Sequence, residues 1–109
     1  YEYHRFCGRC GSATQLQLNE RVLACGHCGA LYYPRIAPCV IGIVLRENTC
    51  LLAHNANFAD GLYSVIAGFI EPGETAEQAL IREIREETGI EAERPEYICS
   101  QPWPFPSQL

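Results

Sequence analysis

Apolar and polar residues alternate near the start of the chain and again in its middle. Apolar residues at positions 16, 18, 22 and 23 surround the polar pair Asn19-Glu20, which predicts a short hairpin. Residues 39–46 (CVIGIVLR) predict a buried strand, residues 47–48 a turn, and residues 49–54 (TCLLAH) its hairpin partner. After a polar loop, residues 62–67 predict a further strand that leads into Gly68.

The period then changes to that of a helix. Residues 75–78 (TAEQ) have the form of a capping box and Gly89 is a good helix stop, so we expect a helix over about Ala76–Thr88. Its buried stripe should consist of Leu80, Ile81 and Ile84. Residues 96–100 (EYICS) predict one more strand beyond the helix.

Length and composition narrow the class of protein. The 109 residues suit one domain, or one domain with a small satellite module, and 48% of them are apolar. The longest apolar run, residues 39–45, is too short to cross a membrane, and no signal segment opens the chain. A net charge of −5 argues against broad attraction to nucleic acid or lipid and fits a site that recruits cations. Because the chain starts at Tyr1 and lacks methionine, we expect it to be part of a longer protein.

Four of the seven cysteines form two Cys-x-x-Cys pairs separated by fourteen residues. This spacing lets four thiolates reach one tetrahedral ion, and about thirty residues cannot bury a sufficient core without such a staple. We therefore predict a zinc ribbon, whose ligands are Cys7, Cys10, Cys25 and Cys28. Two disulfides or a redox dithiol are the alternative. The other three cysteines stand singly, which suggests a reducing cytoplasm.

Three carboxylates on the predicted helix should share one face: Glu83, Glu86 and Glu87. The ordinary interpretation is a solvated acidic face. These residues border the apolar stripe, however, and we expect the neighbouring arginines, Arg82 and Arg85, to point away from them. Clustered carboxylates become favourable once a hard divalent cation such as Mg²⁺ or Mn²⁺ binds.

The same stretch resembles the Nudix box, and every fixed position of that motif matches. The matching residues are Gly68, Glu74, Arg82-Glu83-Ile84, Glu86-Glu87 and Gly89-Ile90. The resemblance implies an α/β fold: a Nudix α/β/α sandwich over residues 35–109, without its C-terminal part, preceded by the zinc ribbon over residues 1–34. It also implies that Glu83, Glu86, Glu87 and the Ala67 carbonyl bind Mg²⁺ or Mn²⁺, and that Glu74 and Arg82 form a structural pair.

Nudix enzymes hydrolyse a nucleoside diphosphate linked to another group. A diphosphate repels hydroxide, so metal ions must neutralise its oxygens and activate water, and a carboxylate must take the proton. Glu87 is our first choice for this base, with Glu83 and Glu86 as the other catalytic candidates. A metal ligand and a base are hard to separate by sequence.

Residues 100–106 (SQPWPFP), together with the ribbon and residues 32–39 (YYPRIAPC), resemble the NADH pyrophosphatase branch of the family. That resemblance implies that Tyr33, Phe69 and Glu20 contact the substrate's base. It also implies a substrate-binding array of Gln101, Pro102, Trp103, Pro104, Phe105, Pro106, Ser107 and Gln108, although the last two stand in reversed order here. The prolines stiffen this loop, and its flat aromatic faces suit a nicotinamide or adenine ring. A rigid loop that covers the core or a dimer interface is the alternative.

The branch implies cleavage of NADH, and less readily NAD⁺, to the nicotinamide mononucleotide and AMP. It also implies action on NAD-capped RNA, a homodimer, and a cytoplasmic protein with no membrane partner. Two alternatives remain. One is a Nudix hydrolase for another nucleotide such as ADP-ribose, and the other is a nucleotide-binding module without catalysis.

Overall fold

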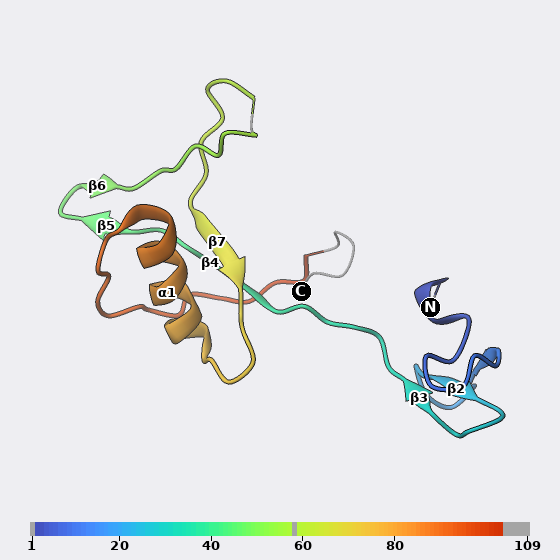
Figure 1. Cartoon of the computed structure of the whole chain (residues 1–109). Coiled ribbons are helices and arrows are strands. Elements are labelled where there is room, and N and C mark those ends of the chain that lie inside the picture. Colours follow the sequence, from blue (N-terminus) through green and yellow to red (C-terminus); the bar gives the residue numbers. More distant parts are fainter. Residues whose placement is uncertain (1, 58, 104–109) are drawn as a thin grey trace. The chain divides into compact units, whose positions relative to one another are not determined.

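The computed structural model describes residues 2–57 and 59–103. Its internal contacts divide the chain into two compact units, Tyr1–Ile36 and Ala37–Leu109. Figure 1 shows the short strands of the first unit and the helix of the second. In the described part of the chain, no helix is long and apolar enough to cross a membrane.

The first unit is built on a small antiparallel sheet in the order β1-β2-β3. Its elements are η1 (Glu2–His4), β1 (Thr14–Leu16), β2 (Leu23–Cys25) and β3 (Leu31–Tyr32). The predicted hairpin is confirmed, because Leu16 pairs with Leu23 across β1 and β2. Val22 is 1% exposed, whereas Leu18 is 97% exposed, so little apolar surface is buried here. A unit this small needs a further source of stability.

Within residues 37–57 and 59–103, the second unit contains four short strands and one helix. The strands are β4 (Cys39–Gly42), β5 (Leu45–Arg46), β6 (Thr49–Cys50) and β7 (Ile66–Phe69). β5 and β6 form the predicted hairpin around the turn at Glu47 and Asn48, and Glu47 adopts a left-handed conformation with φ of 53°. The single strand predicted over residues 39–46 is divided in two, because β4 leaves this hairpin and pairs with β7 instead.

The helix α1 (Ala76–Thr88) has the bounds that the sequence predicts. Thr75 accepts a hydrogen bond from the Gln78 amide at 3.2 Å, and the Gln78 side chain accepts one from the Thr75 amide at 2.9 Å, which completes the capping box. The Gly89 amide donates to the Arg85 carbonyl with φ of 73° at the glycine, which ends the helix.

α1 lies against one face of the β4–β7 pair (Figure 1). Ile84 is buried as predicted, Leu80 and Ile81 are half-buried, and Ala79 is completely buried. Leu80 occupies the space that a side chain at Gly42 would need, since a Cβ there would lie 2.5 Å from Leu80 Cδ1. A side chain at Gly42 would therefore force the Leu80 side chain to move.

Two strand predictions need correction. β4 is not buried on both faces, because side chains alternate along a strand and α1 covers only one face; Ile41 is 69% exposed. The strand predicted over residues 62–67 starts later and continues through Gly68 to Phe69. An isolated bridge between Ala53 and Ser64 replaces its first part.

The strand predicted over residues 96–100 is wrong for this structure. Tyr97 and Ile98 are 71% and 83% exposed, and no strand among the described residues pairs with this segment. A strand is stable only when a neighbouring strand accepts and donates its backbone hydrogen bonds. The apolar pattern alone does not supply that partner.

Candidate functional site

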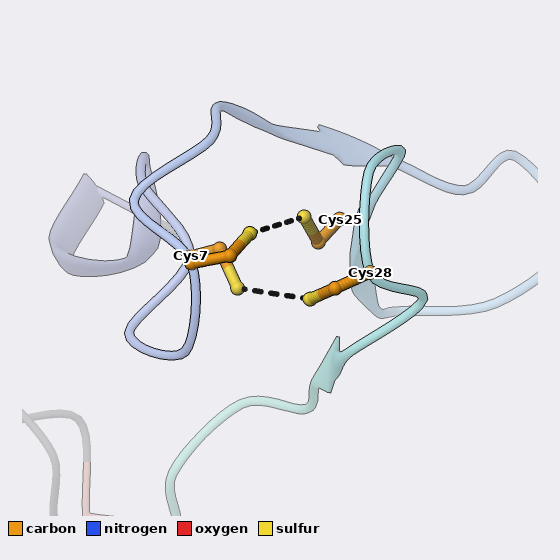
Figure 2. Close-up of side chains that lie close together, drawn as sticks. Cys7, Cys25 and Cys28 are labelled. Carbon is orange, nitrogen blue, oxygen red and sulfur yellow. Dashed lines mark hydrogen bonds between the residues drawn. The ribbon is translucent and has the colours of Figure 1, made fainter.

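The four predicted zinc ligands come together in the first unit. Cys7 and Cys10 lie on one knuckle, and Cys25 and Cys28 lie at the end of β2 and in the turn that follows. The Cys7 and Cys28 sulfurs are 3.5 Å apart, and so are those of Cys10 and Cys25. Figure 2 shows the side chains of Cys25 and Cys28 pointing toward the knuckle that carries Cys7. Cys7 and Cys25 are 3% and 2% exposed.

This arrangement fits a tetrahedral zinc ion. Zinc–sulfur distances of about 2.3 Å place the sulfurs of a four-cysteine site about 3.8 Å apart. The four sulfurs all lie within 4.8 Å of one another. The four ribbon cysteines are thiols and are not joined in disulfides, so the two-disulfide alternative does not describe this structure.

The electrostatics of the cluster also favour a cation. Hydrogen bonds from Ser12, first from its amide and then from its hydroxyl, lower the pKa of Cys10 to about 5. The Ala30 amide acts to lower the pKa of Cys28, but the hydrogen bond with Cys7, burial and the other sulfurs raise it to about 12. Neighbouring sulfurs therefore resist carrying charge together unless a cation neutralises them. Zinc binding would release the proton that Cys28 holds.

In the second unit, Arg82 joins three parts of the Nudix-like motif. Its Nε and Nη2 donate to the two carboxylate oxygens of Glu74 at 2.7 and 3.0 Å. Nη2 also donates to the Phe69 carbonyl at 2.9 Å. Nη1 donates to Glu83 Oε1 at 2.8 Å and to Glu86 Oε2 at 3.1 Å. One guanidinium thus links the end of β7, the loop before α1, and the acidic face of α1.

The expectation that Arg82 points away from the acidic face is therefore wrong. Arg82 and Glu86 are four residues apart on α1 and share one side of the helix. The long arginine side chain also reaches across the loop to Glu74. Arg85 does point elsewhere and pairs with Glu91 at 3.0 Å.

The pKa of the Glu74 carboxyl group is strongly lowered. The bidentate contact with Arg82, followed by the hydrogen bond from the Glu71 amide at 3.0 Å, lowers the pKa of Glu74 to about 2. Its carboxylate is thus held in the charged form, with both oxygens occupied by donors from its own loop and from α1. This is the geometry expected of a residue that fixes the loop–helix junction.

Glu83 lies directly over the backbone of β7. A Cβ at Gly68 would overlap the Glu83 carboxylate, so glycine leaves room for this side chain in the position that it occupies. The Glu83 side chain is 15% exposed, while that of Glu86 is 60% exposed and Glu87 is also exposed. The acidic face therefore runs from a half-buried carboxylate beside the strand to two solvated ones.

Among the described residues, the four cysteines are the one group of three or more metal-ligating side chains whose ligand atoms all lie within 4.8 Å of one another. Glu83, Glu86 and Glu87 do not converge in this way, and Ala67 lies nearby in β7, paired with Ile41. The Arg82 guanidinium occupies oxygens of both Glu83 and Glu86. The acidic face thus already attracts one cation, supplied by the protein itself.

The predicted substrate contacts fall in both units. In the first unit, the Tyr33 hydroxyl donates to Glu20 Oε2 at 3.4 Å, and Tyr33 is 58% exposed. In the second unit, Phe69 ends β7 and is 50% exposed. The side chains of these two aromatic residues are thus accessible to a ligand rather than packed in a core.

Part of the predicted loop array is described. Gln101 and Pro102 are exposed, and Trp103 is 44% exposed. The remaining predicted residues lie outside the described part of the chain: Pro104, Phe105, Pro106, Ser107 and Gln108.

The sequence does not identify Tyr32 as a residue that contacts the cysteine cluster. The Tyr32 hydroxyl lies 3.1 Å from Cys7 Sγ, although the two residues are 25 positions apart. Cysteine spacing indicates metal ligands but does not indicate which other side chains face the sulfurs. The aromatic pair after the second knuckle is the one signal that the sequence offers, and it does not distinguish Tyr32 from Tyr33.

The fold and the motif together define a class of protein. The NUDIX domain family matches residues 35–108, so the chain belongs to the Nudix family. The NADH pyrophosphatase zinc ribbon domain matches residues 3–33. Both expected resemblances are thus confirmed, on the segments that carry the acidic helix and the four cysteines.

Individual relatives agree with this classification. The chain is 49% identical over 106 residues to the NAD-capped RNA hydrolase NudC of Stutzerimonas stutzeri, covering 97% of this chain and 38% of the relative. It is 48% identical over 109 residues to the protein of the same name from Salmonella agona, covering 100% of this chain and 42% of the relative. The chain thus spans about two fifths of the length of these curated relatives.

A solved structure supports the fold. The crystal structure of a NUDIX hydrolase from Nitrosomonas europaea superposes with a TM-score of 0.61 at 31% sequence identity. The match covers 75% of this chain and 49% of that chain.

Proposed function

We propose that the protein containing this chain hydrolyses the diphosphate bond of NADH and NAD⁺, with Mg²⁺ or Mn²⁺, to the nicotinamide mononucleotide and AMP. The observation that carries this proposal is the presence in one chain of both the NADH pyrophosphatase zinc ribbon and the complete Nudix motif. Relatives named NAD-capped RNA hydrolase align with nearly the whole chain, which supports NAD-capped RNA as a second substrate. The ribbon, residues 1–34, and the hydrolase domain, residues 35–109, form separate domains in this proposal.

The catalytic cation is assigned to the acidic face of α1 and the adjacent strand. Glu83, Glu86, Glu87 and the Ala67 carbonyl offer only oxygen ligands, which Mg²⁺ and Mn²⁺ prefer. The contacts of Glu83 and Glu86 with the Arg82 guanidinium support this assignment, since the same oxygens already accept a positive group. When bound, such a cation neutralises the diphosphate and lowers the pKa of water.

The side chains divide the remaining tasks. Glu74 and Arg82 hold the loop against α1, so that Glu83 keeps its place over Gly68. Glu87 is exposed, and no ion pair with Arg82 is among the described contacts. Its carboxylate can therefore take the proton from the attacking water. The same exposure leaves it open to binding the cation.

Substrate recognition is assigned to aromatic faces. Tyr33, Phe69 and Trp103 are each about half exposed, so each can offer a flat surface to a nicotinamide or adenine ring. Glu20, held by the Tyr33 hydroxyl, adds an acceptor for an amine or a ribose hydroxyl. The proposed array also includes Gln101 and Pro102 and, outside the described residues, Pro104, Phe105, Pro106, Ser107 and Gln108.

We also propose a homodimer in the cytoplasm. A cluster of four cysteines that binds metal only as thiolates supports a reducing compartment. Light scattering of the purified protein at several concentrations tests the dimer.

The experiment that tests the activity offers the whole protein NADH, NAD⁺, NAD-capped RNA, ADP-ribose and ATP, each with Mg²⁺ or Mn²⁺. Products are identified by mass spectrometry. We expect the nicotinamide mononucleotide and AMP from the dinucleotides, and 5′-monophosphate RNA from capped RNA. Preferential turnover of ADP-ribose or ATP would redirect the substrate assignment, and the absence of turnover on all five would favour a binding module.

A further inference from the structure

A tyrosine side chain from outside the two knuckles faces a sulfur of the zinc cluster. Tyr32, the last residue of β3, places its hydroxyl 3.1 Å from Cys7 Sγ. Cys7 is 3% exposed, and Tyr32 is half-buried, so water has little access to this contact. The Cys7 sulfur also accepts a hydrogen bond from the Arg9 amide at 3.4 Å, and the Cys10 amide and the Cys28 thiol act on it as well.

One face of the tyrosine ring has a stacking neighbour. The His4 imidazole stacks on it with a centroid distance of 5.2 Å and an interplanar angle of 22°. The backbone of His4 is tied to β1, because its carbonyl accepts a hydrogen bond from the Thr14 hydroxyl. On the side of the first knuckle, Gly8 has no side chain, and even a Cβ there would lie only 3.7 Å from the Tyr32 hydroxyl. The hydroxyl therefore has a defined position, directed at one sulfur.

Four thiolates bound to one Zn²⁺ leave a net charge of −2 in a small, half-buried site. Hydrogen bonds from outside the ligand set spread this charge and fix the orientation of the ligands. An O–H donor to a thiolate stabilises the anion without competing for zinc, because the hydroxyl is not itself a ligand. The Tyr32 hydroxyl meets these conditions at Cys7, the more buried cysteine of its knuckle.

We propose that Tyr32 is a positioning residue of the zinc ribbon, whose hydroxyl donates a hydrogen bond to the zinc-bound Cys7 thiolate and thereby slows the release of the metal. The contact also ties β3 to the first knuckle, across 25 residues of sequence. β3 ends immediately before Tyr33, so the segment that carries this predicted substrate contact is anchored to the metal site.

Tyr32→Phe tests the proposal, because it removes the hydroxyl but keeps the ring that stacks on His4. Tyr33→Phe is the matched control: it removes a hydroxyl and a hydrogen bond to Glu20 from the next residue, without touching a sulfur. The first measurement is the rate at which the zinc-loaded whole protein transfers its zinc to a chromogenic chelator. We expect Tyr32→Phe to release zinc about 10- to 100-fold faster, and Tyr33→Phe to behave as the wild type.

A second measurement distinguishes a hydrogen bond to sulfur from general support of the fold. Loss of a donor raises the energy of the sulfur lone pairs, so in the Co²⁺-substituted protein the sulfur-to-cobalt charge-transfer band should move to longer wavelength in Tyr32→Phe and stay in place in Tyr33→Phe. Zinc release within twofold of the wild type and an unmoved cobalt band would overturn the proposal.

A third comparison applies if Tyr32→Phe takes up metal poorly. In the Cys7→His background, the sulfur that accepts the hydrogen bond is absent, so adding Tyr32→Phe should accelerate metal release far less than it does in the wild type. An equally large acceleration in both backgrounds would show that Tyr32 acts through packing, and would contradict the proposal.

Discussion

The ribbon and the Nudix motif both gather negative groups, but they do so in opposite ways. The four ribbon sulfurs converge within 4.8 Å, and two of the cysteines are nearly inaccessible to solvent. The three carboxylates of α1 do not converge on one point, and Glu86 and Glu87 are exposed. The Arg82 guanidinium bridges Glu83 and Glu86. A closed set of four ligands suits an ion that holds the fold, whereas an open set suits an ion that must also meet a substrate.

The difference follows from how each site is built. In the ribbon, two tight turns bring pairs of ligands together, and the small sheet brings the pairs together. In the second unit, one helix presents its carboxylates over a strand, and Gly68 sets how closely Glu83 can approach. Arg82 then balances the charge until another cation competes for the same oxygens.

The largest expected effect is the loss of zinc when a ribbon cysteine, but not another cysteine, is replaced. Cys25→Ser removes one of four zinc ligands from a unit with little buried apolar surface, so the zinc content should fall from about one per chain to nearly zero and the ribbon should lose its fold. Elemental analysis and circular dichroism measure both. Cys50→Ser and Cys99→Ser should keep the zinc, and loss of zinc from either control would refute the ligand assignment.

The next effect concerns the open site. Glu87→Gln keeps the shape of an exposed side chain but removes its charge, so turnover of NADH should fall by about 10²- to 10⁴-fold. The melting temperature without added divalent metal should stay unchanged or rise, because like-charge repulsion on α1 is relieved. Steady-state kinetics and a thermal melt check this pair of results. A marked loss of stability together with full activity would instead assign Glu87 a structural role.

A smaller effect tests recognition of the ring. Trp103→Ala should weaken NADH hydrolysis by about 10- to 100-fold, the value of one stacking face. A smaller diphosphate substrate that does not use this contact should be affected much less. Kinetic constants for both substrates decide the matter, since an equal decline on both would mean that Trp103 supports the fold or a dimer interface.

The smallest effect concerns the loop–helix junction. The pKa of Glu74 is lowered to about 2, so its contact with Arg82 contributes stability that is complete above about pH 4.5 and is lost as the pH falls towards 2. Glu74→Gln should therefore lower the melting temperature by several degrees at pH 7 and make little difference near pH 2. Glu93→Gln, at an exposed position, is the control and should change neither value. A pH-independent difference between wild type and Glu74→Gln would mean that packing, rather than charge, holds the junction.

Local signals in the sequence predicted the parts of the molecule that depend on neighbouring residues. The bounds of α1 follow from Thr75 and Gly89, and the zinc cluster follows from cysteine spacing, because caps and knuckles act over a few residues. The pairing of β4 with β7 and the direction of the Arg82 side chain were not predicted. Both depend on partners distant in sequence or on a long side chain that can reach several of them.

The segment at residues 96–100 also shows that a local pattern does not identify a distant partner. Its apolar residues predict a strand, yet Ile98 is 83% exposed and the described structure offers no strand beside it. Tyr32 is a further case, since its contact with Cys7 joins two positions 25 residues apart. Periodicity indicates which apolar side chains should be buried, but it does not identify the strand or helix against which they pack.

The central claim is that one chain holds two cation sites of opposite kind, a closed zinc site and an open catalytic site. The most direct measurement follows NADH turnover and zinc content together while the whole protein is dialysed against a weak chelator, and again after Mg²⁺ or Mn²⁺ is returned. We expect turnover to disappear and return with the added cation, while zinc stays at about one per chain throughout. Turnover that persists without added Mg²⁺ or Mn²⁺, or that falls only as zinc is lost, would contradict the account.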